Sequence, residues 1–258
     1  MPTRRAVTFG TLAALSLPYL RPARAATVDD LRQAVQRFDQ LHAILVQRGE
    51  DVLLADAPRG RGLARAANIK SCSKSLLALL LGTALARGEV ASLSARLGDV
   101  APALLPDDAT AGAADLTMED LVTLRGGLQS TSGGNYGEWV ASSNWVAYVL
   151  RQPRVAPNGG RMIYSTGTTH VLGAALATAT GQSLLELARD RLWRPLGIDI
   201  PAWTRDPQGF YFGGNEMALT PEAMLRMAVM VRDGGAYGGR QVIPADWIAA
   251  SRVARIIP

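Results

Sequence analysis

Apolar residues recur along this chain with two spacings, and each spacing predicts a different kind of element. Two short β-rich runs, residues 42–47 and 51–55, are joined by Arg48-Gly49-Glu50 and predict a hairpin. Spacings of three and four residues predict helices over most of the remainder. These helices are expected at residues 29–40, 71–87, 117–125, 139–150, 168–180, 183–192, 221–232 and 245–254. The pattern is therefore one strand pair followed by a long, mostly helical stretch with too few strands to complete a sheet.

The helix predicted at residues 71–87 is apolar on almost every face. Residues 76–81 read Leu-Leu-Ala-Leu-Leu-Leu, so this helix should be buried on most sides. Thr117, followed three residues later by Asp120, predicts a capped helix start. Pro221 opens another helix at the position where proline is tolerated.

The charge of the chain depends on its first 25 residues. The 258 residues carry a formal charge of +5, and 48% of them are hydrophobic, enough for a substantial core. Arg4, Arg5, Arg21 and Arg24 lie in the first 25 residues, which contain no acidic residue, so the remainder carries +1. The other arginines are scattered, and we expect no nucleic-acid partner.

Residues 1–25 have the three zones of an export signal. Met1 to Arg5 is short and positive, the following residues are mostly apolar, and Ala23-Arg24-Ala25 offers a cleavage site. Arg4-Arg5 resembles a twin-arginine signal, and an ordinary Sec signal is the alternative. The apolar run is too short to span a bilayer stably. We therefore expect a signal peptide at 1–25, one domain at 26–258, a periplasmic or secreted location, and no stable membrane span after cleavage.

Cysteine and histidine are scarce. The chain has one cysteine, Cys72, and two histidines, so it can form no internal disulfide and offers no metal-spaced cluster. We expect no metal and no cofactor. Cys72 should be a small buried hydrophobe beside the helix start.

Ser71-Cys72-Ser73-Lys74 is an S-x-x-K motif. Residues three apart on a helix share one face, so the lysine amine can reach the serine hydroxyl. Burial lowers the pKa of a lysine and lets it act as a base for the serine nucleophile. The free N–H groups of the helix start suit an oxyanion. The alternative is an ordinary helix start, with serine as its cap and lysine on the surface.

Lysine is rare in this sequence, which favours the catalytic interpretation. Only Lys70 and Lys74 occur among the 27 basic residues, and arginine is used everywhere else. Arginine does not deprotonate in proteins, so it cannot replace a lysine base.

Tyr164 follows a turn and precedes a predicted helix. A tyrosine there can move a proton between serine, lysine and a leaving group if a nearby cation lowers its pKa. The alternative is a half-buried tyrosine at the end of a loop or strand.

Five segments together resemble the serine β-lactamase and penicillin-binding superfamily. The similarity is to the branch that contains class C enzymes, esterases and 6-aminohexanoate-dimer hydrolases. The segments are residues 68–75 around Ser71, 116–128, 164–173 starting with Tyr-Ser-Thr-Gly, 193–198 and 213–221. They match in order and spacing, over roughly residues 28 to 255.

The resemblance implies a fold and a set of roles. The fold would be α/β (α+β) and β-lactamase/transpeptidase-like, with an antiparallel sheet flanked by helices and a helical region. Ser71 would be acylated, Lys74 would be the base, and Tyr164 would assist proton transfer. Thr166 would contact substrate, although β-lactamases of this branch have asparagine there, which argues for esterase or amidase relatives.

Aromatic residues near the predicted site have two interpretations. Tyr136 and Trp139 follow a glycine-rich loop and could line a substrate wall, and packing is the alternative. His170 could be a base, and an exposed or core-satisfied histidine is the favoured alternative.

The resemblance fails at the C-terminal end. Members of the superfamily continue with strands that carry a Lys- or His-x-Gly motif, and this chain stops at Pro258 without one. The hairpin would then have an exposed edge. We expect a domain that lacks its C-terminal strands, with low stability and little activity.

Two functions follow from these observations. The first is hydrolysis of a small-molecule ester or amide, β-lactam-like bonds included, through a Ser71 acyl-enzyme. The second is a non-catalytic periplasmic remnant or binding protein that keeps the fold.

Overall fold

The computed structural model describes residues 27–254. The signal peptide expected at residues 1–25 lies outside them. The chain divides into two compact units, Met1–Asp39 and Gln40–Pro258. We describe each unit by itself.

The described part of the first unit contains helix α1 (Val28–Val35). Its start is a capping box, in which the Thr27 hydroxyl accepts the Asp30 N–H at 3.1 Å and the Asp30 carboxylate accepts the Thr27 N–H at 2.8 Å. The predicted helix over 29–40 is too long at its C-terminal end. Phe38 lies beyond the helix and is 62% exposed.

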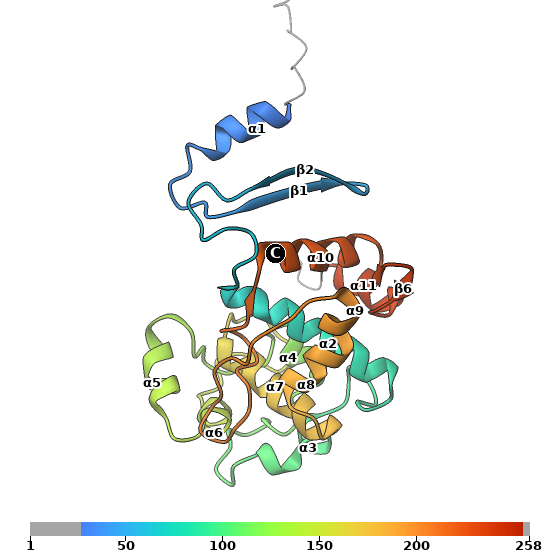
Figure 1. Ribbon diagram of the computed structural model, residues 1–258. Coiled ribbons are helices and arrows are strands. Elements are labelled where there is room, and N and C mark those ends of the chain that lie inside the picture. Colours follow the sequence, from blue (N-terminus) through green and yellow to red (C-terminus); the bar gives the residue numbers. More distant parts are fainter. Residues whose placement is uncertain (1–26, 255–258) are drawn as a thin grey trace, which may run out of the picture. The chain divides into compact units, whose positions relative to one another are not determined.

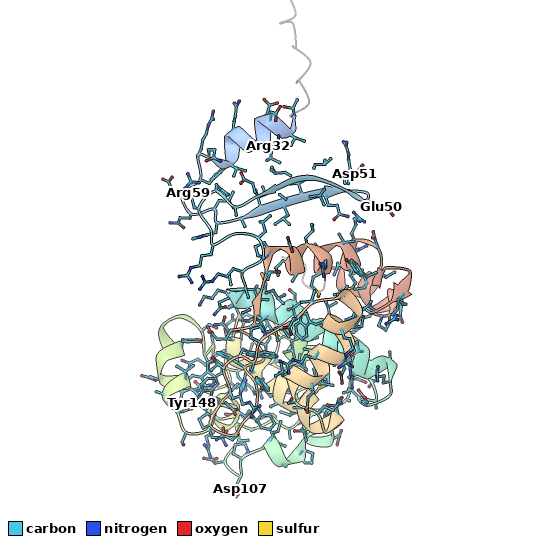
Figure 2. The ribbon with its side chains drawn as sticks, in the orientation of Figure 1. Arg32, Glu50, Asp51, Arg59, Asp107 and Tyr148 are labelled. Atoms are coloured by element: carbon cyan, nitrogen blue, oxygen red, sulfur yellow. The ribbon has the colours of Figure 1, made fainter. Side chains whose placement is uncertain are left out.

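The second unit begins with the predicted hairpin, which the structure confirms. Strands β1 (Ile44–Arg48) and β2 (Asp51–Asp56) pair antiparallel, with an irregularity between Val46 and Gln47 (Figure 1). Gly49 has a φ of +62°, which a glycine adopts without a steric cost. Figure 2 shows Glu50 and Asp51 at the tip of this hairpin.

Two shorter sheets complete the strands of the described residues. Strand β3 (Ala67–Asn68) pairs with β4 (Ala218–Leu219), and β5 (Ala236–Tyr237) pairs with β6 (Arg240–Gln241), both antiparallel. Residues far apart in sequence are thereby joined beside Ser71. The prediction of few strands in a mostly helical stretch is confirmed.

Helices make up most of the second unit (Figure 1). The longer ones are α2 (Ser73–Ala86), α7 (Thr166–Thr180) and α10 (Pro221–Arg232). The shorter ones are α3 (Leu97–Val100), α4 (Met118–Val122), α5 (Tyr136–Ala141), α6 (Trp145–Leu150), α8 (Leu184–Ala188), α9 (Arg194–Leu196) and α11 (Ala245–Ser251). Single turns lie at η1 (Lys70–Cys72), η2 (Pro102–Leu104), η3 (Gly133–Asn135) and η4 (Arg189–Trp193).

Helix α7 lies at the centre of the core. It contacts α2, α3, α4, α6 and α8, and its side chains are buried from Thr166 to Leu176. Helix α2 is buried on most sides, as its leucines predicted. Apolar burial of this kind, at roughly 25 cal/mol per Å², is the main force that holds these helices together. Helix α2, which carries Lys74, and helix α7, which carries Thr166, are therefore both anchored in the core.

Three further helices differ from the sequence-based prediction. The predicted helix at 139–150 is two helices, because the Asn144 side chain caps α6 by accepting the Ala147 N–H at 2.9 Å. The helix that starts after Thr117 ends at Val122, since Leu124 has a φ of +60°. Helix α8 continues into η4 as a wider, π-type turn.

Within residues 27–254, no single helix has both the length and the hydropathy that a membrane crossing needs. Helix α7 and the segment Leu184–Leu196 meet these criteria only as a pair, across a bend of 83°.

Candidate active site

Ser71 lies on a tight turn immediately before α2. This turn begins at Lys70, whose φ of +51° is a left-handed conformation that non-glycine residues seldom adopt. The Asn68 side chain holds it: Oδ1 accepts the Lys70 N–H at 2.7 Å, and Nδ2 donates to Glu216 Oε2 at 2.8 Å. Strain of about 1–3 kcal/mol persists only where surrounding contacts enforce it, and these contacts lie directly beside Ser71.

The segment around β4 supports the same turn. The Ser73 hydroxyl donates to Lys70 O at 2.7 Å and accepts the Met217 N–H at 3.3 Å. The Ile69 N–H donates to Met217 O at 2.9 Å. Residues some 145 positions apart in sequence thus fix where Ser71 points.

Lys74 contacts three groups with its amine. Nζ lies 3.3 Å from Ser71 Oγ, 3.3 Å from Thr166 Oγ1 and 2.7 Å from Gly214 O. A neutral amine has two hydrogens and one lone pair. If the hydrogens are donated to Thr166 and Gly214, the lone pair is left to accept the Ser71 hydroxyl proton.

Burial lowers the pKa of Lys74 below its ordinary value of 10.5. The hydrogen bond with Tyr164 and the charge of its phenolate act in the opposite direction and are the smaller effects. The neutral form of this amine is therefore more accessible near neutral pH than that of a solvated lysine.

The Tyr164 side chain lies over the same amine. Lys74 Nζ is 5.0 Å from the centroid of the phenol ring, and 46% of the residue is exposed. Burial raises the pKa of Tyr164, but hydrogen bonds with Ser71 and Lys74 and the lysine charge together outweigh it, so the net shift is downward. The structure thus brings Ser71, Lys74 and Tyr164 together.

The Thr166 side chain is buried against Lys74 and is not open to solvent. It is 5% exposed, its hydroxyl contacts Lys74, and the same hydroxyl lies 2.9 Å from Ser132 Oγ. Ser132 Oγ also accepts the Thr166 N–H at 2.8 Å. This arrangement favours a role for Thr166 in orienting Lys74.

The two predicted aromatic substrate contacts differ from each other. Trp139 is fully buried and its indole N–H donates to Trp145 O at 3.0 Å, so its placement matches the packing alternative and argues against a substrate contact. Tyr136 is partly exposed, and its hydroxyl lies 3.4 Å from Asn215 Nδ2. Tyr136 also stacks on Phe212, which fixes its ring.

Cys72 corrects one prediction. It is exposed rather than buried. It lines an apolar hollow together with Met224 and Met227 of α10, so its side chain is not enclosed by the core.

Sequence reasoning assigned no role to Ser132, Gly214 or Asn68. Ser132 was part of a loop described only as polar and glycine-rich, and Gly214 acts through its backbone carbonyl, which no side-chain pattern reveals. The segment 213–221 was noted only as one of the five matching segments. Its match was the one available signal for Gly214.

Among the side chains of residues 27–254, no group of three or more His, Cys, Asp or Glu residues could hold a metal ion. The Ser71 hydroxyl, the Lys74 amine and the Tyr164 phenol lie close enough together to exchange a proton.

Comparisons with known proteins identify the family of this chain. The family model named Beta-lactamase matches residues 31–247. A 90-residue segment is 30% identical to the 6-aminohexanoate-dimer hydrolase of Paenarthrobacter ureafaciens and covers 34% of this chain and 23% of that protein.

Solved structures show the same fold. A candidate 6-aminohexanoate-dimer hydrolase from Bacillus anthracis superposes with a TM-score of 0.73 at 16% identity, over 85% of this chain and 61% of its own. EstCE1, a hydrolase with promiscuous acyltransferase activity, gives a TM-score of 0.72 at 16% identity, over 89% and 76%. The chain thus spans less than two thirds of the Bacillus protein. The predicted β-lactamase/transpeptidase-like fold is confirmed.

Proposed function

Because the chain belongs to the Beta-lactamase family, we propose that it is a serine hydrolase that cleaves an ester or amide through a Ser71 acyl-enzyme. The observation that carries the proposal is the contact between Lys74 Nζ and Ser71 Oγ, with Tyr164 beside both. An amine whose pKa is lowered by burial can take the proton of a neighbouring serine hydroxyl, and this activates the serine as a nucleophile.

Acylation begins when Ser71 Oγ attacks the substrate carbonyl carbon and Lys74 Nζ takes the hydroxyl proton. The carbonyl oxygen becomes an oxyanion, and the Ser71 N–H at the helix start is the donor we assign to it. The bond to the leaving group then breaks, and the Tyr164 hydroxyl gives that group a proton, which Lys74 replaces.

Deacylation reverses these roles. A water attacks the acyl carbon while the neutral amine of Lys74 takes its proton. The acyl bond to Ser71 Oγ breaks, the oxygen regains a proton, and the carboxylic acid leaves. Each group returns to its starting state, so the cycle is balanced with water as the only co-reactant.

We propose a small ester or linear amide as the substrate class. The amide hydrolase and esterase names of the relatives support this choice, as does Thr166 in place of an asparagine. The partly exposed phenol of Tyr164 marks the open side from which such a substrate would approach.

We also propose that the chain is exported and acts in the periplasm or outside the cell. The zones of residues 1–25 support this. N-terminal sequencing of the protein recovered outside the cytoplasm should begin at Ala26. Recovery with Met1 intact in the cytoplasm would contradict export.

Intact-mass analysis after a fluorophosphonate probe tests the hydrolase proposal. The wild type should gain one adduct on Ser71, and Ser71→Ala should gain none. Ser75→Ala is the matched control, because Ser75 is exposed four residues later, in the first turn of α2, and its loss should leave labelling unchanged. Absence of an adduct on wild-type protein would contradict the proposal and favour a non-catalytic binding protein.

A further inference from the structure

A buried histidine and aspartate lie directly behind the site. The side chains of His170 and Asp206 are both fully buried, and His170 Nε2 lies 2.9 Å from Asp206 Oδ2. His170 Nδ1 accepts the N–H of Gly213 at 3.3 Å. These partners assign the ring proton to Nε2, since one nitrogen accepts and the other must donate.

The Asp206 side chain is also fixed by hydrogen bonds of its own. Its Oδ1 accepts the backbone N–H of Gln208 at 2.9 Å and that of Phe210 at 2.8 Å. The carboxylate therefore has a fixed orientation, and the ring is left with its acceptor nitrogen facing Gly213. A carboxylate that contacts one ring nitrogen in this way determines that the other nitrogen, here Nδ1, is free to accept a hydrogen bond.

His170 is connected to Lys74 through the backbone of Gly213 and Gly214. Gly213 precedes Gly214, whose carbonyl oxygen accepts the Lys74 amine at 2.7 Å. Helix α7 provides both the Thr166 hydroxyl and His170, one turn apart. A Cβ on Gly213 would lie 2.6 Å from Thr169 O, so the loop is in direct contact with α7.

We propose that His170 is a positioning residue. Asp206 fixes its tautomer, His170 anchors the N–H of Gly213, and Gly214 O in turn holds Lys74 Nζ in line with Ser71 Oγ. The inference rests on the proposed function for its kinetic consequence, and on the contacts alone for the placement of Lys74.

Packing is the competing explanation. The imidazole lies among the rings of Trp139, Trp145 and Phe212, with centroids 5.9, 5.5 and 5.7 Å away. Two variants separate the explanations. His170→Phe keeps an aromatic ring and removes the acceptor, while His170→Asn keeps an acceptor near the Nδ1 position and removes the ring. Both lose the contact with Asp206, so they are matched.

The first readout is the rate of Ser71 labelling, resolved into a maximal rate and an apparent affinity. If His170 positions Lys74, His170→Phe should lower the maximal labelling rate by about 10–100-fold, because a small displacement of a reacting group slows the chemical step. The apparent affinity for the probe should be unchanged. His170→Asn should label faster than His170→Phe even where it melts at a lower temperature. Equal rates, or a faster His170→Phe, would overturn the inference.

The second readout does not need activity. Because Lys70 and Lys74 are the only lysines, protein labelled with ¹³C at lysine Cε gives two signals, and the Lys70 signal serves as reference. A charge-assisted bond to Gly214 O favours the ammonium form, so its loss in His170→Phe should move the Lys74 titration to lower pH, by about one unit. In His170→Asn the titration should match the wild type.

A structural control excludes a general loss of stability. Arg191 is buried and donates to Glu89 at 2.6 and 2.8 Å, and its other side-chain partners are Thr83 and Gln182 rather than site residues. Glu89→Gln should lower the melting temperature and leave the Lys74 signal unchanged. An unchanged Lys74 titration in His170→Phe would overturn the inference. Failure of wild-type labelling would contradict only the proposed function, since the Lys74 titration would still decide the placement.

Discussion

At the scale of single residues, Lys74 has the contacts of a base and the burial that makes a base possible. Its amine has three partners, and burial outweighs the opposing effect of Tyr164 on its pKa. Lys70, only four positions away, has a side chain that is 71% exposed. The two lysines therefore provide an internal comparison between a partly buried and an exposed amine.

Exchanging each lysine for arginine tests this difference. Lys74→Arg should lower the rate of Ser71 labelling by about 10²–10⁴-fold, because a guanidinium cannot accept the proton. Lys70→Arg should label at close to the wild-type rate. Labelling of Lys74→Arg at the wild-type rate would rule out Lys74 as the base.

The acid limb of the pH–rate profile reports the same amine. The labelling rate should rise with pH as Lys74 loses its proton, with a midpoint below 10.5. Tyr164 raises the pKa of Lys74, so Tyr164→Phe should move this limb to lower pH. A shift to higher pH in Tyr164→Phe would show that the phenol has the opposite effect.

Sequence alone could predict the local part of this site. Ser71 and Lys74 are three residues apart, and a helix brings them together. Tyr164 is a candidate from its place after a turn and before a helix, and the resemblance then implies its role. Gly214 and the Asp206–His170 pair depend on long-range packing and on backbone groups. His170 matches its core-satisfied alternative, but no local pattern could identify Asp206 as its partner.

At the scale of elements, helix starts were easier to predict than helix ends. Capping by Thr117 and the proline start of α10 are local signals, and both are seen. The ends of α1 and α4 depend on backbone conformations, such as the φ of +60° at Leu124, that the apolar spacing does not reveal. The start of α6 is an exception, because its Asn144 cap lies inside a run that the apolar spacing predicts as one helix.

Gly82 in the middle of α2 tests how tightly elements pack. A Cβ there would overlap the Trp247 indole of α11, whose N–H donates to Ala78 O at 3.0 Å. Gly82→Ala should therefore destabilise the fold by about 1–3 kcal/mol in chemical denaturation, despite the better helix propensity of alanine. Gly137→Ala is the control, since Gly137 of α5 has open space and should gain up to about 1 kcal/mol. Equal effects would contradict the α2–α11 packing.

At the scale of the whole molecule, burial is uneven. Leu54 is the one buried residue of β1 and β2, and Val52 is 54% exposed, whereas the first eleven residues of α7 are all buried. The low overall stability expected from the sequence stays a prediction.

Hydrogen exchange should follow this gradient. Amides of β1 and β2 should exchange fastest among the regular elements of the second unit, because local opening there exposes little apolar surface. Amides in the middle of α7 should exchange only on global unfolding. Equal protection of the hairpin and α7 would contradict this gradient.

The most direct test of the account is the titration of Lys74 itself, followed by the Cε signal of the wild-type protein. The account predicts a midpoint below the ordinary 10.5, equal to the midpoint of the acid limb of Ser71 labelling. A midpoint at or above 10.5 would mean that the amine stays charged beside Ser71, and the proposed mechanism would be wrong.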